Sequence, residues 1–80
     1  MFFTYVLKSL RDSGYYYGHT KDMDARLARH HAKKVRSTKA RAPFVLHYME
    51  AFETKSQAYQ QELFFKRVEG KTYLKEKGVM

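Results

Sequence analysis

Apolar and polar positions at the start of the chain alternate in the way that is typical of β-strands. Residues 2–8 mix aromatic, β-branched and aliphatic side chains, and a strand there would carry Phe3 and Tyr5 on the same face. Residues 11–14 contain Asp, Ser and Gly, which favour a turn. Because a second β-prone run covers residues 15–20, the first twenty residues predict an antiparallel hairpin.

A helical pattern follows the hairpin. Asp22 can cap a helix that runs to about Lys34, with Met23 and Leu27 as a short apolar stripe. Basic residues fill the last turn of this helix, where they suit the helix dipole. Residues 35–43 are polar and basic and predict a loop.

The second half of the chain predicts one more strand and a capped helix. Residues 44–49 are too apolar for a strand that is exposed on both faces. Thr54 and Gln57 have the spacing of a capping box, so a helix is expected to begin at Thr54 and to run to about Glu69. Gly70 is expected to end that helix.

Residues 71–77 predict a short last helix. The order of elements is therefore ββαβα(α), which gives an α/β (α+β) fold with a three-stranded, mostly antiparallel sheet flanked by two to three helices. A chain of 80 residues is expected to form one domain over residues 1–80.

Composition narrows the class of protein. Hydrophobic residues make up 44% of the chain, which is enough to form a core and excludes a disordered protein. The chain has no cysteine, which excludes a disulfide framework and any cysteine-ligated metal site. No apolar run has the length of a membrane span, and the start of the chain lacks the features of a signal peptide. We therefore expect a soluble, cytoplasmic protein without a membrane partner.

The net charge of +8 indicates an acidic partner. Residues 21–41 hold eight lysines and arginines against two aspartates, so most of the excess lies in one stretch. Nucleic acid is the commonest partner of so small a basic domain. The alternative is a basic surface whose charge only keeps the protein in solution.

Two sets of residues could carry chemistry. Asp22, Arg26 and His30 are spaced to lie on one face of the first helix, where the spacing alone favours a surface ladder with an Asp22–Arg26 pair. Glu62 falls on the part of its helix that should face the sheet, where a carboxylate is costly unless it is paired or holds a metal. The sequence leaves two roles for Glu62: it pairs with Lys66, or it binds a metal ion.

The tyrosine triplet 15–17 adds a third set. Strand alternation places Tyr16 on the face opposite its two neighbours. Gly18 follows on the same face as Tyr16, and a glycine there leaves backbone uncovered where a ligand could approach.

Taken together, these residues resemble the signature of the GIY-YIG nucleases. The two tyrosine-containing triplets of that signature resemble Phe3-Thr4-Tyr5 and Tyr16-Tyr17-Gly18. The segment Gly18-His19-Thr20 is similar to the Gly-x-Thr continuation of the signature. Arg26 and His30 fall where the family carries an essential arginine and a frequent histidine. The loop 37–43, which reads Ser-Thr-Lys-Ala-Arg-Ala-Pro, resembles that of short stand-alone members. Glu62 falls at the position of the metal-binding glutamate of this family.

The resemblance implies a metal-dependent endonuclease that hydrolyses DNA phosphodiesters. Glu62 would then hold one Mg²⁺ or Mn²⁺ ion, and Arg26 would bind the oxygens of the phosphate. Tyr5 would orient and deprotonate the attacking water with help from cationic surroundings, and Tyr16 would bind the same water or the phosphate. His30 would either shuttle the proton or bind the phosphate.

DNA would be held mainly through its backbone, which gives affinity without sequence preference. The residues expected to contact DNA are Gly18, Lys33, Lys34, Arg36, Lys39 and Arg41. Two alternatives to an autonomous nuclease are open: a non-catalytic nucleic-acid-binding module in which Glu62 holds no metal, and a nuclease subunit that cuts only with a protein partner.

Overall fold

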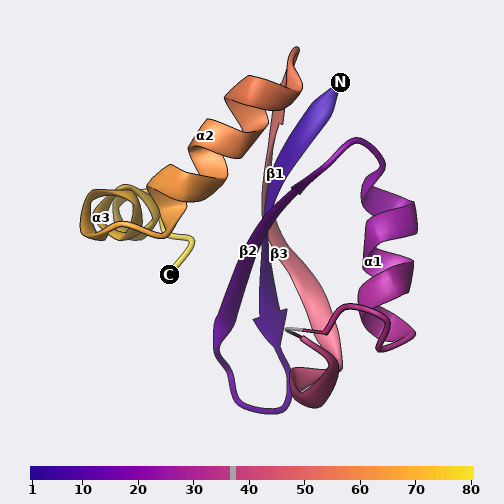
Figure 1. Cartoon of the computed structure of the whole chain (residues 1–80). Helices are drawn as coiled ribbons and strands as arrows, with labels where there is room; N and C mark the ends of the chain where they lie inside the picture. Colours follow the sequence, from indigo (N-terminus) through magenta and orange to yellow (C-terminus); the bar gives the residue numbers. More distant parts are fainter. Residues whose placement is uncertain (37) are drawn as a thin grey trace.

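The computed structural model describes residues 1–36 and 38–80 and confirms the predicted order of elements (Figure 1). The elements are β1 (Phe2–Ser9), β2 (Tyr15–Thr20), α1 (Met23–His31), a 3₁₀ turn η1 (Lys39–Arg41), β3 (Phe44–Phe52), α2 (Lys55–Phe65) and α3 (Val68–Glu76). Within the described ranges, no helix combines the length and the apolar character that crossing a bilayer requires.

The sheet is antiparallel, with strand order β2-β1-β3, so β1 pairs on both sides. Tyr5 on β1 lies opposite Gly18 on β2 and Met49 on β3. The β1–β3 pairing shifts by one residue between Val6 and Leu7, which leaves His47 as the extra residue of a bulge.

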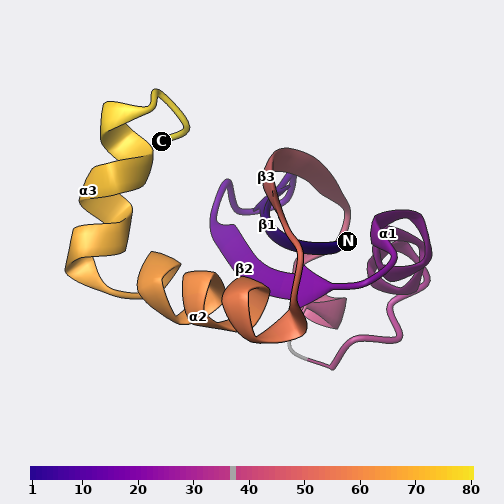
Figure 2. The ribbon, with the colours of Figure 1, turned by 90° about the horizontal axis from the view of Figure 1, so that it is seen from above.

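Helices cover both faces of the sheet (Figure 2). Helix α1 lies on one side, and α2 and α3 lie on the other side. Because neighbouring residues of β1 point to opposite faces, the strand supplies two cores. Tyr5 and Leu7 pack with Phe44 beneath α1, and Val6 packs with Phe65 and Leu74 beneath α2 and α3.

The ends of α1 and β3 differ from the prediction. Helix α1 ends at His31 and not at Lys34, because Lys33 adopts a left-handed conformation with φ 59°. The loop that follows contains the 3₁₀ turn η1, and Ser37 of the predicted basic loop lies outside the described residues. Strand β3 continues to Phe52, three residues beyond the apolar run that predicted it.

Gly70 does not end a helix. Helix α2 ends at Phe65, and Gly70 is a buried residue inside α3. A Cβ on Gly70 would lie 1.8 Å from the carbonyl oxygen of Phe64. The glycine therefore allows α3 to pack against the end of α2, and the prediction that it terminates α2 is wrong because glycine also serves close backbone approach.

Candidate active site

The phenol of Tyr5 lies at the centre of a buried hydrogen-bonded cluster beneath α1. Tyr5 is 0% exposed. Its hydroxyl oxygen accepts a hydrogen bond from Arg26 Nε at 3.1 Å and lies 3.1 Å from His30 Nε2. Arg26 and His30 are one helical turn apart on α1, so both side chains reach the same residue of β1. The structure thus brings together three of the predicted site residues.

Gly18 makes room for this phenol. A Cβ at Gly18 would lie 2.5 Å from the hydroxyl oxygen of Tyr5, and Gly18 is buried. The expectation that Gly18 exposes backbone to a ligand is therefore corrected: the Tyr5 side chain occupies that space.

His30 is enclosed by aromatic rings. The ring centroids of Tyr5, Tyr16 and Phe44 lie 5.9, 5.2 and 6.1 Å from that of His30. Its Nδ1 lies 2.8 Å from the hydroxyl oxygen of Thr38, a buried residue that the sequence analysis did not single out. Burial, followed by the nearby charges of α1, lowers the pKa of His30 to about 4, so the imidazole is neutral at pH 7.

Tyr5 is also neutral in this environment. Burial raises the pKa of its phenol, and the hydrogen bond and charge of Arg26 offset that effect only in part. The cationic surroundings expected to help Tyr5 act as a base are therefore outweighed by desolvation. In return, the hydrogen bond to Tyr5 raises the pKa of the Arg26 guanidinium.

The predicted Asp22–Arg26 pair does not form. Asp22 caps α1 by accepting a hydrogen bond from the backbone N–H of Ala25 at 3.1 Å, whereas Arg26 turns to Tyr5. Tyr16 lies on the face opposite Tyr15 and Tyr17, as strand alternation predicted, and its ring centroid is 6.3 Å from that of Tyr5. Since Tyr16 is only partly buried, it is more accessible than Tyr5.

Glu62 lies on α2 beside the edge strand β2, close enough to the Tyr5 cluster for its charge to add to the raised pKa of the Tyr5 phenol. Oε1 is 2.7 Å from His19 Nδ1, and Oε2 accepts a hydrogen bond from Lys66 Nζ at 2.8 Å. The side chain is only 12% exposed. Burial opposes its ionisation, but the hydrogen bonds from Lys66 and His19 outweigh burial and hold the pKa of Glu62 below its ordinary value.

Glu62 could bind a hard divalent cation through its one carboxylate. Among the described residues, no group of three His, Cys, Asp or Glu side chains is arranged to hold a metal ion. Mg²⁺ is commonly bound by one or two carboxylates and keeps several waters. Lys66 is 50% exposed, so its flexible side chain can move away from Oε2.

Four of the five predicted basic DNA contacts have exposed side chains: Lys33, Lys34, Arg36 and Lys39. Arg41 differs because it is held by the protein itself. Its Nε donates to Asp12 at 2.9 Å, and its guanidinium lies 5.6 Å from the ring centroid of Phe44. Arg41 therefore ties η1 to the hairpin turn, and the sequence could not show this long-range partner.

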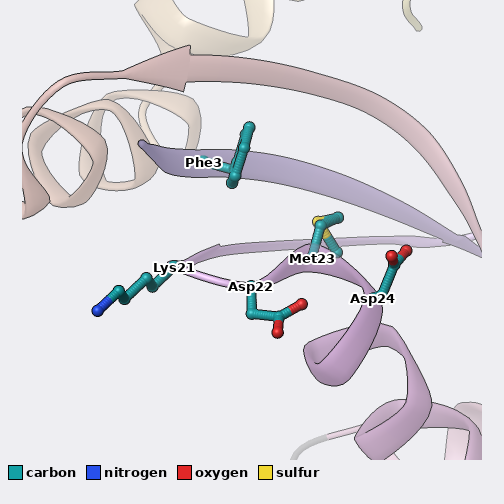
Figure 3. Close-up of a pocket in the computed structure, with 5 residues that line it drawn as sticks. All are labelled: Phe3, Lys21, Asp22, Met23 and Asp24. Atoms are coloured by element: carbon teal, nitrogen blue, oxygen red, sulfur yellow. The ribbon is translucent and has the colours of Figure 1, made fainter.

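Surface hollows lie near the C-terminal end of β2, and two of them bear on the site. One of about 480 Å³ is lined by His19, Lys55, Ser56 and Tyr59, next to Glu62 through its contact with His19. The other, at the start of α1, is lined by Phe3, Lys21, Asp22, Met23 and Asp24 (Figure 3). In the close-up Met23 points toward the strand that carries Phe3, and two carboxylates stand on the helix side. That second hollow is poorly suited to a phosphate.

Proteins of known family or known structure are similar to this chain over most of its length. Residues 1–76 match the model of the GIY-YIG catalytic domain. The chain is 43% identical over 77 residues to a UPF0213 protein of Bacillus licheniformis, a match that covers 91% of this chain and 78% of the relative. It is 38% identical over 79 residues to the UPF0213 protein YazA of Bacillus subtilis, covering 94% and 79%. The solution NMR structure of a UPF0213 protein from Bacillus halodurans has a TM-score of 0.56 at 31% identity, covering 95% of this chain and 84% of that one.

Proposed function

The chain belongs to the GIY-YIG catalytic domain family, and we propose that it is an endonuclease that hydrolyses DNA phosphodiesters with one Mg²⁺ or Mn²⁺ ion. A nuclease-like function and a nucleic-acid substrate follow from the family, whose nucleases generally depend on a divalent metal. The observation that carries the proposal is the Tyr5 hydroxyl held between Arg26 and His30. Binding alone requires no such buried arrangement.

Arg26 binds the scissile phosphate. Its Nε is engaged with Tyr5, which fixes the plane of the guanidinium. The Nη groups then remain to donate to the non-bridging oxygens, and a rigid planar fork suits phosphate better than an ammonium group does. Because Arg26 is only partly buried, a bound phosphate can reach it.

Tyr5 orients the attacking water, and His30 takes the proton that Tyr5 passes on. Both ring nitrogens of His30 are engaged, by Tyr5 and by Thr38, so the shuttle role fits His30 better than direct binding of the phosphate. Arg26 is one of the charges that lower the pKa of His30. A phosphate bound at Arg26 would offset that charge and make His30 a better base. Tyr16, at the more accessible side, binds the same water or the phosphate.

Glu62 would hold the metal ion, and His19 would fix the orientation of its carboxylate. When bound, the ion stabilises negative charge on the phosphate and on the leaving oxygen. Lys33, Lys34, Arg36 and Lys39 contact the DNA backbone, and Arg41 supports their loop from within the fold. A cytoplasmic location, expected from the sequence, belongs to the same proposal.

One observation favours a second candidate function. Both carboxylate oxygens of Glu62 already have protein partners, as they would in a non-catalytic nucleic-acid-binding module. A nuclease subunit that acts only with a protein partner would show the same contacts.

The experiment that tests the proposal is incubation of the protein with duplex, nicked, flapped and branched DNA. Each substrate is tested with Mg²⁺, with Mn²⁺ and with chelator. The nuclease predicts cleavage of at least one substrate that chelator abolishes. Salt-sensitive binding to every substrate without cleavage would favour the binding module.

A further inference from the structure

The hydrogen atoms of the Tyr5 cluster can be assigned by counting donors and acceptors. A guanidinium has only donors, so the Tyr5 oxygen must be the acceptor in its bond with Arg26 Nε. The Tyr5 O–H is fully buried and needs an acceptor of its own. Among the described residues, the remaining atom in reach is His30 Nε2, at 3.1 Å. Tyr5 therefore donates to Nε2, which carries no proton.

This assignment fixes the rest of the chain of bonds. A neutral imidazole with a bare Nε2 carries its proton on Nδ1. That proton goes to the Thr38 hydroxyl oxygen at 2.8 Å, and the Thr38 O–H goes to the backbone carbonyl of Val35 at 3.3 Å. Every donor then has an acceptor, in keeping with the absence of unpartnered buried side-chain atoms in the described part of the chain.

The opposite tautomer leaves a defect. If His30 carried its proton on Nε2, that N–H would point at the Tyr5 oxygen, and the Tyr5 O–H would have no acceptor in a buried site. The Val35 carbonyl does not favour this opposite tautomer. It also accepts hydrogen bonds from the backbone N–H groups of Thr38 and Lys39, so it has donors with either tautomer. The cost of an unsatisfied buried O–H selects the Nδ1–H form.

We propose that Thr38 is a positioning residue that holds His30 in the Nδ1–H tautomer, so that Nε2 is the atom that accepts the proton of Tyr5. The proposal rests on the proposed nuclease function and names how its proton acceptor is set. Thr38 is 0% exposed, and its own carbonyl accepts a hydrogen bond from the Arg41 N–H at 2.9 Å. The loop that contains Thr38 therefore carries the basic residue Lys39 and also contacts the proton acceptor, His30.

The proton transfer balances without a further reactant. The water gives a proton to the Tyr5 oxygen as the Tyr5 O–H proton moves to Nε2, and the hydroxide oxygen bonds to phosphorus as the bond from phosphorus to the leaving oxygen breaks. The leaving oxygen takes up a proton from solvent water, and His30 returns its proton to solvent when the products leave. His30 becomes an imidazolium whose Nδ1–H still donates to Thr38, so the bond serves both protonation states. The groups around His30 are the phenols of Tyr5 and Tyr16 from the sheet and the charged or titratable side chains of α1, namely Arg26, Arg29 and His31.

The test uses the full chain with ¹⁵N-labelled histidine and two variants of Thr38. Thr38→Val removes the acceptor at similar size, and Thr38→Ser keeps the hydroxyl. Thr72→Val is the matched control, because Thr72 is an exposed threonine of α3 whose hydroxyl donates, among the described residues, to the carbonyl of Val68 in its own helix. NMR reports which ring nitrogen of His30 carries the proton.

We expect wild type, Thr38→Ser and Thr72→Val to carry the His30 proton on Nδ1, and Thr38→Val to lose that preference. In cleavage, kcat of Thr38→Val should fall about 10- to 100-fold with little change in KM and with an altered pH profile, and Thr38→Ser should restore both. An Nε2 proton in wild type, or an unchanged tautomer in Thr38→Val, would overturn the proposal. Should Thr38→Val not fold, wild type and Thr38→Ser decide the tautomer. Absence of cleavage in every protein, with the expected tautomers, would count against the nuclease and not against the tautomer.

Discussion

Gly18 and Tyr5 face each other across the β1–β2 pair so closely that a methyl group on Gly18 would lie 2.5 Å from the Tyr5 hydroxyl oxygen. The phenol cannot move aside easily because Arg26 and His30 hold its oxygen. The position of the predicted water-activating group is therefore set by the absence of a side chain on the neighbouring strand.

Gly18→Ala should accordingly damage both stability and activity. Overpacking a buried site costs about 1–3 kcal/mol, and the displaced phenol should lower cleavage by more than the loss of folded protein explains. Gly14→Ala is the matched control, because a Cβ there also lies 2.5 Å from a side chain, that of Arg41, but outside the Tyr5 cluster. Thermal melts and cleavage rates check the pair. Equal effects of the two substitutions would contradict this account.

Tyr5→Phe removes one hydroxyl and keeps the ring. We expect the fold to survive, with a cost of about 1–3 kcal/mol because a buried acceptor on His30 loses its donor. Cleavage should fall by about two orders of magnitude or more. Tyr15→Phe is the control, since Tyr15 packs on the opposite face of the sheet. Undiminished cleavage by Tyr5→Phe would move the role to Tyr16.

His30 predicts a pH dependence of stability. Its pKa is lowered from 6.5 to about 4 in the folded state. Between pH 4 and pH 6.5, His30 therefore binds a proton in the unfolded chain but stays neutral in the folded protein. Stability is thus fully present above pH 6.5 and is lost as the pH falls toward 4, by on the order of 3 kcal/mol. Melts of wild type and His30→Gln between pH 7 and 4.5 isolate this contribution. A His30 ring that titrates near pH 6.5 in the folded protein would contradict it.

The loop that carries the basic residues predicts salt-dependent DNA binding. Changing Lys33, Lys34 and Lys39 to alanine should flatten the plot of log affinity against log salt by about one unit per lost phosphate contact. The control removes the same charge from the opposite side of the sheet, at Arg67, Lys75 and Lys77, which are exposed residues of the α3 segment. Equal slopes for the two triple variants would show that this loop does not bind DNA.

Local signals predicted the fold well where they act over a few residues. Asp22 and Thr54 cap α1 and α2 as expected, and the Thr54 capping box forms with Gln57. The predicted end of α2 was wrong because the true end depends on Phe64 and Gly70, which meet only when α3 folds back on α2. Helix ends that are set by tertiary packing leave no local signal.

The same limit applies to the site. Helical spacing placed Arg26 and His30 on one face of α1 but favoured a surface ladder, whereas the family resemblance indicated them as site residues. The structure brings both to Tyr5. The contact of His19 with Glu62 spans 43 residues, and that of Thr38 with His30 joins a loop to a helix face. Alternation along β2 does place His19 on the face opposite Gly18, which was the available hint for the former.

Glu62 separates the nuclease from the alternatives. Because its pKa lies below the ordinary value of 4.5, the ionised carboxylate stabilises the fold at neutral pH, and this contribution is lost as the pH falls below that value. Glu62→Gln should therefore melt slightly below wild type at pH 7 without metal, and the two should converge in acid.

The measurement that tests the account most directly is a titration of Mn²⁺ into wild type and Glu62→Gln, followed by a cleavage assay on the same samples. Glu69→Gln, an exposed carboxylate at the start of α3, is the matched control. The account predicts that Glu62→Gln alone loses Mn²⁺ binding and divalent-dependent cleavage, while all three proteins bind DNA. Equal Mn²⁺ binding and equal cleavage by wild type and Glu62→Gln would contradict it.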